Sequence, residues 1–99
     1  MYRDMVEVVL GLIDKAIEEE ELDFLIYRGT PNGLSIFIKD NIAHVDVYFP
    51  RGPYDDQNVR VNWVACGPKD AVFTEKFVTM LELAADAAKA AESFIAAPE

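Results

Sequence analysis

The residues best suited to chemistry are the only histidine, His44, and the carboxylate two positions further on, Asp46. Residues i and i+2 of a β-strand lie on one face, so a strand would place the imidazole beside the carboxylate. Histidine is the side chain that most readily exchanges a proton near neutral pH. Ser35 falls on the neighbouring predicted strand, but nothing in the sequence places a serine or cysteine nucleophile at His44. We therefore expect a protein that is not an enzyme.

The sequence gives weaker evidence for metal or redox chemistry than for a pair of His44 with Asp46. Asp55 and Asp56 are adjacent carboxylates without the spaced oxygen ligands of a calcium loop. The chain has no glycine-rich phosphate loop, CxxC or HExxH motif, so we predict no metal site and no cofactor. Cys66 is the single cysteine, which excludes an internal disulfide and fits a cytoplasmic location. Its place at the end of a predicted strand suggests a small, packed side chain.

Acidic residues concentrate at the two ends of the chain. Of the 18 acidic residues, 14 fall within residues 1–23 and 70–99, and the net charge is −9. A phosphate backbone needs a basic footprint and an anionic membrane needs basic residues, so direct binding to nucleic acid or to membrane is not expected. A strongly acidic surface instead suits a basic protein partner, because opposite charge speeds encounter and suppresses wrong partners.

Four consecutive glutamates, residues 18–21, stand where the first predicted helix ends. Carboxylates at a helix C-terminus oppose the helix macrodipole by about 0.3–1 kcal/mol each, and broken local rules often mark functional sites. We predict a partner-binding surface that could imitate a phosphate array, with contact residues added from the loop after the third strand. Its residues are Asp4, Glu7, Asp14, Glu18, Glu19, Glu20, Glu21, Asp23, Arg51, Tyr54, Asp55 and Asp56.

The periodicity of apolar residues predicts the elements that position these groups. Residues 3–20 and about 70–96 repeat every three to four positions and predict helices, with Asp70 or Thr74 as the second helix's N-cap. Four alternating runs between them predict strands over residues 22–28, 34–39, 42–49 and 58–66. Hairpin-length links join the first three runs, which favours an antiparallel meander.

The order helix, four strands, helix predicts one α+β domain over residues 1–99, a two-layer sandwich. We expect both helices on one face of the sheet. That face should bury Val61 and Trp63 on the last strand, and Leu12 should lie on the apolar face of the first helix. The other face is expected to be wetter, with aromatic and imidazole groups that suggest an alternative interface: Tyr27, Phe37, His44 and Tyr48.

These features favour a non-enzymatic, acidic binding or inhibitor protein that docks on a basic partner, such as a nucleic-acid-handling complex. Small acidic phage inhibitors of host defence complexes, and immunity proteins that block nuclease toxins, use this kind of physics. The alternative is a small dimeric chaperone or adaptor that binds through the aromatic sheet face, with a homodimer as its simplest form. No apolar run approaches the ~18–20 residues that span a bilayer. Asp4 and Glu7 would interrupt a secretory core, so we expect no signal peptide.

Overall fold

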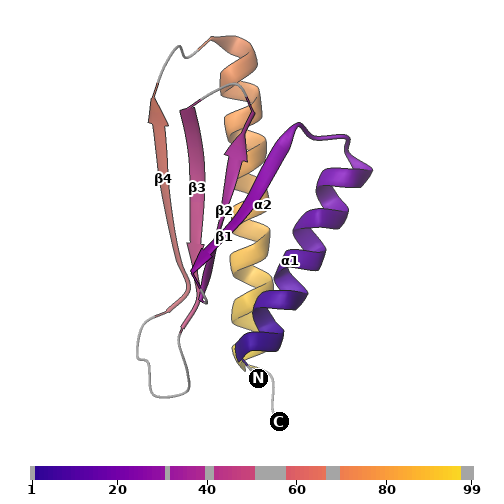
Figure 1. The fold of residues 1–99 in the computed structure, drawn as a ribbon, viewed down its shortest axis with the longest axis vertical. Coiled ribbons are helices and arrows are strands. Elements are labelled where there is room, and N and C mark those ends of the chain that lie inside the picture. The colour runs from indigo at the N-terminus through magenta and orange to yellow at the C-terminus, as the bar shows by residue number, and fades with distance from the viewer. Residues whose placement is uncertain (1, 31, 40–41, 51–57, 67–69, 97–99) are drawn as a thin grey trace.

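The computed structural model describes residues 2–30, 32–39, 42–50, 58–66 and 70–96. A first helix is followed by four strands and a second, longer helix (Figure 1). Their bounds are α1 Tyr2–Glu19, β1 Phe24–Thr30, β2 Gly33–Ile38, β3 Ile42–Tyr48, β4 Arg60–Cys66 and α2 Ala71–Ala96. The predicted order of elements is therefore confirmed, with boundaries that differ by up to two residues.

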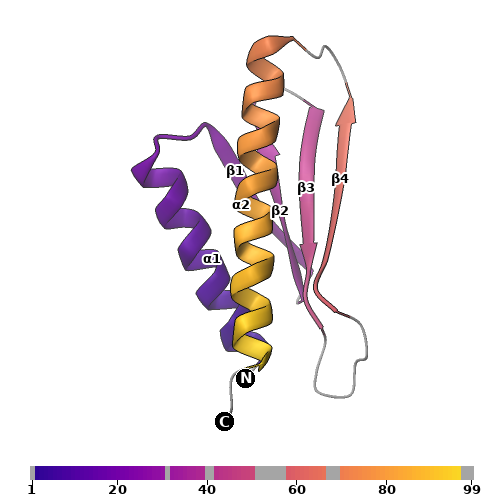
Figure 2. The same ribbon diagram turned by 180° about the vertical axis from the view of Figure 1, so that it is seen from behind.

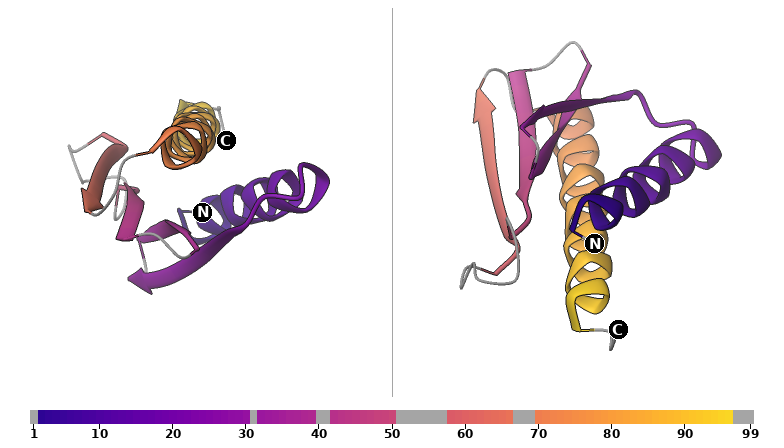
Figure 3. Two further views of the ribbon diagram at one scale, coloured as in Figure 1. Left: turned by 90° about the horizontal axis from the view of Figure 1, so that it is seen from above. Right: turned by 60° about the horizontal axis from the view of Figure 1, so that its bottom comes forward.

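The four strands form one antiparallel sheet in the order β1-β2-β3-β4. Both helices lie on the same face of this sheet (Figures 2 and 3). Helix α2 packs mainly on β3, also contacts β2 and β4, and lies beside α1, and β4 is an edge strand of the sheet. The predicted two-layer α+β architecture and the meander are confirmed.

The core lies between the sheet and the two helices. Ile26, Ile36, Val45 and Trp63 form one row across the sheet, and Ile36 and Val45 have no exposed surface. The helices bury apolar side chains against this face: Met5, Val6, Val9, Ile13, Phe73, Met80, Leu83, Ala84, Ala87 and Ala91. Alternation in the strands and 3.6-residue periodicity in the helices thus converge on one interior.

Helix α1 ends in a hydrogen-bonded C-cap. The Leu22 amide donates to the Ile17 carbonyl (2.9 Å) and the Glu21 amide to the Glu18 carbonyl (3.3 Å). This is the Schellman pattern, whose left-handed residue is usually glycine. Here the left-handed residue is Glu21, with φ 53°. The last turn of α1 has no basic residue, so its carboxylates stand against the negative end of the helix dipole.

Asp70, one of the two predicted caps, is the N-cap of α2. The Asp70 side chain accepts a hydrogen bond from the Phe73 amide at 2.8 Å, and the Thr74 hydroxyl donates to the Asp70 carbonyl. Further along, Ala84 and Ala91 have no exposed surface and Ala87 almost none. These small side chains lie on the buried side of α2, which packs beside α1.

Two expectations about burial are wrong. Val61 and Trp63 lie on the helix-facing side of β4, as predicted. Both are exposed, because β4 is an edge strand and α2, which packs mainly on β3, covers it only in part. Leu12 is half exposed. It lines a shallow crevice of about 220 Å³ between α1 and α2, with Leu83 and Asp86 on the opposite wall.

Candidate functional site

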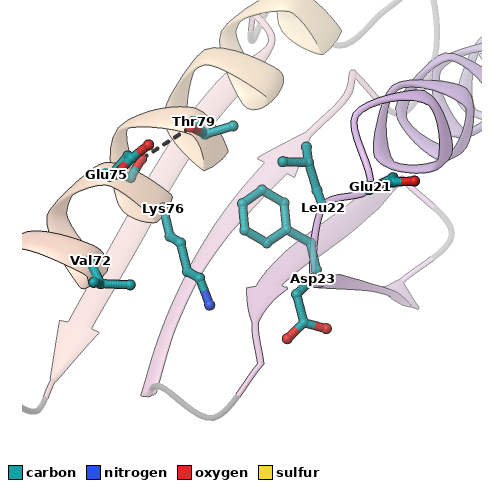
Figure 4. Close-up of a pocket in the computed structure, with 8 residues that line it drawn as sticks. Glu21, Leu22, Asp23, Val72, Glu75, Lys76 and Thr79 are labelled. Carbon is teal, nitrogen blue, oxygen red and sulfur yellow. Dashed lines mark hydrogen bonds between the residues drawn. The ribbon is translucent and has the colours of Figure 1, made fainter.

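The acidic end of α1 borders a groove between the start of β1 and the first turns of α2. The groove has a volume of about 270 Å³ (Figure 4). We call it the acidic groove, and its lining residues are Glu21, Leu22, Asp23, Phe24, Val72, Glu75, Lys76 and Thr79. Apolar side chains make part of the lining, and the carboxylates of Glu21, Asp23 and Glu75 are exposed. Lys76 is the one cation among these residues.

Three of the predicted carboxylates are held in ion pairs within the chain. Glu7 accepts a hydrogen bond from the Arg28 guanidinium of β1. The Lys15 ammonium lies 3.9 Å from Glu19, and the Lys39 ammonium lies 3.3 Å from Asp23. All six side chains keep substantial solvent exposure, so each pair is worth about 1 kcal/mol or less. These intramolecular ion pairs therefore leave fewer of the predicted carboxylates available to a partner.

The other predicted carboxylates differ in position. Asp14 and Glu18 are exposed on α1, and Glu20 and Glu21 are exposed just after it. None of these four has an ion-pair partner in the part of the chain that the structure describes. The side chain of Asp4 and the predicted loop residues lie outside the described part: Arg51, Tyr54, Asp55 and Asp56.

The alternative interface lies on the sheet face opposite the helices, which no described element covers. Phe37 and His44 are cross-strand neighbours with ring centroids 5.1 Å apart. The Arg60 guanidinium lies 5.6 Å from the centroid of the Tyr48 ring. Tyr27 is 63% exposed. The four predicted residues thus share one face but do not form one cluster. Phe37 contacts His44, Tyr48 contacts Arg60, and Tyr27 has no ring contact among the described residues.

Three polar side chains, Ser35, His44 and Asp46, lie together on the same face. The Ser35 hydroxyl donates to Asp46 Oδ1, and His44 Nε2 lies 3.5 Å from Asp46 Oδ2. The carboxylate therefore separates the hydroxyl from the imidazole. In a hydrolytic triad the histidine must contact the hydroxyl and the carboxylate must orient the histidine. Here Asp46 contacts both Ser35 and His44, an order of contacts that differs from that of the triad.

Cys66 corrects one expectation. It ends β4 and is exposed, not packed. β4 is an edge strand, so Cys66 has a paired strand residue, Ile42 of β3, on one side only. Within the described residues, no three His, Cys, Asp or Glu side chains converge as a metal site would require. Neither described helix is long and apolar enough to cross a bilayer.

No family model matches the chain, and comparisons with curated proteins and with solved structures find no similar protein. The surfaces of the protein are therefore the basis on which its function is inferred.

Sequence reasoning missed one half of the acidic groove. Val72, Glu75, Lys76 and Thr79 come from α2, about fifty residues after the acidic run, and no spacing rule links them to it. The signal available in the sequence was Val72 itself, an apolar residue in the first turn that falls outside the periodic apolar face of the helix, and the structure leaves it exposed. It indicated that the first turn of α2 carries more apolar surface than the core uses.

Proposed function

We propose that this protein is a non-enzymatic binding protein that docks on a basic partner through the acidic groove and the carboxylates beside it, Glu18 and Glu20. The observation that carries the proposal is the composition of the groove: exposed carboxylates around apolar side chains. Lysine and arginine have the complementary structure, a hydrophobic stem with a charged head. A basic side chain of the partner would lay its stem along Leu22 and Val72 and place its head among the carboxylates.

The conformation of Glu21 supports this assignment. A left-handed backbone costs an L-residue about 1–2 kcal/mol, and glycine would avoid that cost. The chain nevertheless has glutamate there, at the groove and at the unfavourable end of a helix dipole. Departures from local stability rules tend to occur where function requires a particular side chain.

The chemistry of the partner follows from the charge. A surface that binds phosphate groups is rich in arginine and lysine. A row of exposed carboxylates on α1 and after it, Asp14, Glu18, Glu20 and Glu21, competes for such a surface. We therefore propose a nucleic-acid-handling protein or complex as the partner, blocked by occupation of its basic site, as in inhibition of a defence complex or neutralisation of a nuclease toxin.

The test compares capture from a host lysate by three immobilised chains: wild type, E20Q/E21Q, and the charge-matched control D86N/E99Q, which changes an exposed position of α2 and the last residue of the chain. We expect wild type and control to retain the same basic protein at low salt, and E20Q/E21Q to bind it roughly three- to tenfold more weakly. High salt should release it from every chain. Equal capture by all three chains at both salt concentrations would exclude this function.

A defined probe locates the site without the partner. In a ¹⁵N NMR titration with a deca-arginine peptide, shift changes should concentrate on residues 18–24 and 72–79. Equal changes along the exposed face of α2 would mean that the peptide senses net charge alone, and the groove would lose its assignment.

A second candidate function uses the uncovered sheet face. Tyr27 is 63% exposed and Leu25 52%, which is a large apolar area for a surface that no described element covers. This favours an adaptor or chaperone that holds a partner segment on Leu25, Tyr27 and Phe37. The variant Y27S/F37S should then abolish capture of that partner, while E20Q/E21Q retains it. The opposite pattern assigns binding to the acidic groove.

A further inference from the structure

The edge of the helix layer leaves an apolar corner between α2 and β4. Along the row that crosses the sheet, Ile36 and Val45 are fully buried but Trp63 is 57% exposed. The Trp63 ring contacts Phe77 of α2 edge-on, with centroids 5.3 Å apart. Val61 beside it on β4 and Val78 beside Phe77 on α2 are also exposed. We call Val61, Trp63, Phe77 and Val78 the apolar corner.

Helix α2 continues this surface along most of its length. Starting at Thr74, the positions on the corner side recur at alternating steps of four and three residues, the spacing of a helix-pairing seam. The seam is Thr74, Val78, Leu81, Ala85, Ala88, Glu92 and Ile95. Five of the seven residues are exposed, Val78 at 47% and Ile95 at 39%, and Leu81 and Ala88 are partly exposed. At a rise of about 1.5 Å per residue the seam is about 32 Å long.

We propose that this seam is the interface of a homodimer, in which α2 packs antiparallel against α2 of a second copy. With the twofold axis between Ala85 and Ala88, Val78 meets Ile95 of the second copy and Ala85 meets Ala88. The alanines allow close approach at the centre. The second helix would extend the helix layer over β4 and cover Trp63 and Val61, which α2 of the same chain leaves exposed.

Charge complementarity selects the second copy as the occupant. In this register Glu82, which flanks the seam, lies opposite Lys89 of the second copy, and symmetry repeats the pair. Both side chains are exposed, and neither has an ion-pair partner among the described residues. Flanking charges of this kind set partner and orientation in paired helices.

The direction of packing follows from Glu92. In a parallel pair, equivalent seam positions face each other, so Glu92 would meet Glu92 and the two carboxylates would repel. In the antiparallel register Glu92 meets Leu81, where its stem covers apolar surface and its head reaches solvent. Glu92 is thus the weak point of the seam, and its replacement by leucine should tighten the dimer.

The test is charge exchange, read by analytical ultracentrifugation over a concentration series. Wild type should dimerise reversibly. E82K and K89E should each dimerise at least about tenfold more weakly, since each places like charges together at two sites. An equimolar mixture of E82K and K89E should recover dimerisation as a heterodimer with both pairs restored. E75K makes the same charge change as E82K near the start of α2, without an opposite lysine, and should leave the dimer intact.

Two independent readouts accompany this series. Trp63 is the only tryptophan, so its emission should shift to shorter wavelength as wild type dimerises, and E92L should show the shift at lower concentration. Circular dichroism establishes that each variant is folded. The proposal is overturned if wild type stays monomeric at every concentration, if its dimer ignores both charge reversals, or if the mixture fails to recover. None of these outcomes depends on the acidic groove.

Discussion

Replacing Glu21 by glycine should stabilise the fold. Glu21 has φ 53°, which costs an L-residue about 1–2 kcal/mol, and its carboxylate opposes the dipole of α1 by about 0.3–1 kcal/mol. Glycine loses more chain entropy on folding than glutamate does, which reduces the gain in stability by about 0.5–1 kcal/mol. The net expectation for E21G is a gain of about 1 kcal/mol. In a domain of this size that raises the melting temperature by about 4–8 °C.

Thermal unfolding by circular dichroism measures the effect, and two variants separate its causes. E21Q removes the charge and keeps the strained backbone, so it should gain only about 0.3–1 kcal/mol. E20G removes the same charge one residue earlier, where the amide still donates a helical hydrogen bond to the Ala16 carbonyl. It should be neutral or slightly destabilising. The reasoning is refuted if E21G gains no more stability than E20G.

The remaining predictions concern the core, the cap and the thiol. Ile36→Ala should lower the free energy of unfolding by about 2–5 kcal/mol in urea denaturation, because the side chain is fully buried, while Leu25→Ala on the exposed face should cost far less. Asp70→Ala should cost about 1 kcal/mol by loss of the cap to the Phe73 amide, which Asp70→Asn should largely retain. Cys66 should react with Ellman's reagent in the native protein as fast as in urea, and a protected thiol would contradict its exposed position.

The fold was predictable because the different local patterns in the sequence agree with one another. Alternation in the strands, helical periodicity at both ends and turn residues between them all specify the same elements. The cross-strand registers then follow: Ile36 pairs with Val45 and Phe37 with His44, so each strand keeps its apolar side toward the helices. Even Asp70, one of two candidate caps, is the one used.

The lateral position of the helices was not predictable. Alternation on β4 correctly identifies which side faces the helices, but it contains no information about how far the helix layer extends. The exposure of Trp63 and Val61 depends on α2 packing mainly on β3 and covering the edge strand β4 only in part, a tertiary detail set by packing among α1, α2 and the sheet. The acidic groove is unpredictable for the same reason, since Glu75 reaches it from the far end of the chain.

The two proposed surfaces lie on opposite sides of α2, and this arrangement has a consequence for binding. Val72 and Glu75 face the end of α1, whereas Val78 and Ile95 belong to the seam on the β4 side. A dimer through the seam therefore leaves both acidic grooves accessible, and antiparallel packing directs them toward opposite ends of the helix pair. Two linked sites on a partner with repeated basic surfaces bind far more tightly than one, without any new contact. The charge-reversed variant K89E retains every groove residue, and its added negative charge by itself favours a basic partner. A loss of apparent affinity for such a partner in K89E would therefore come from the loss of bivalency.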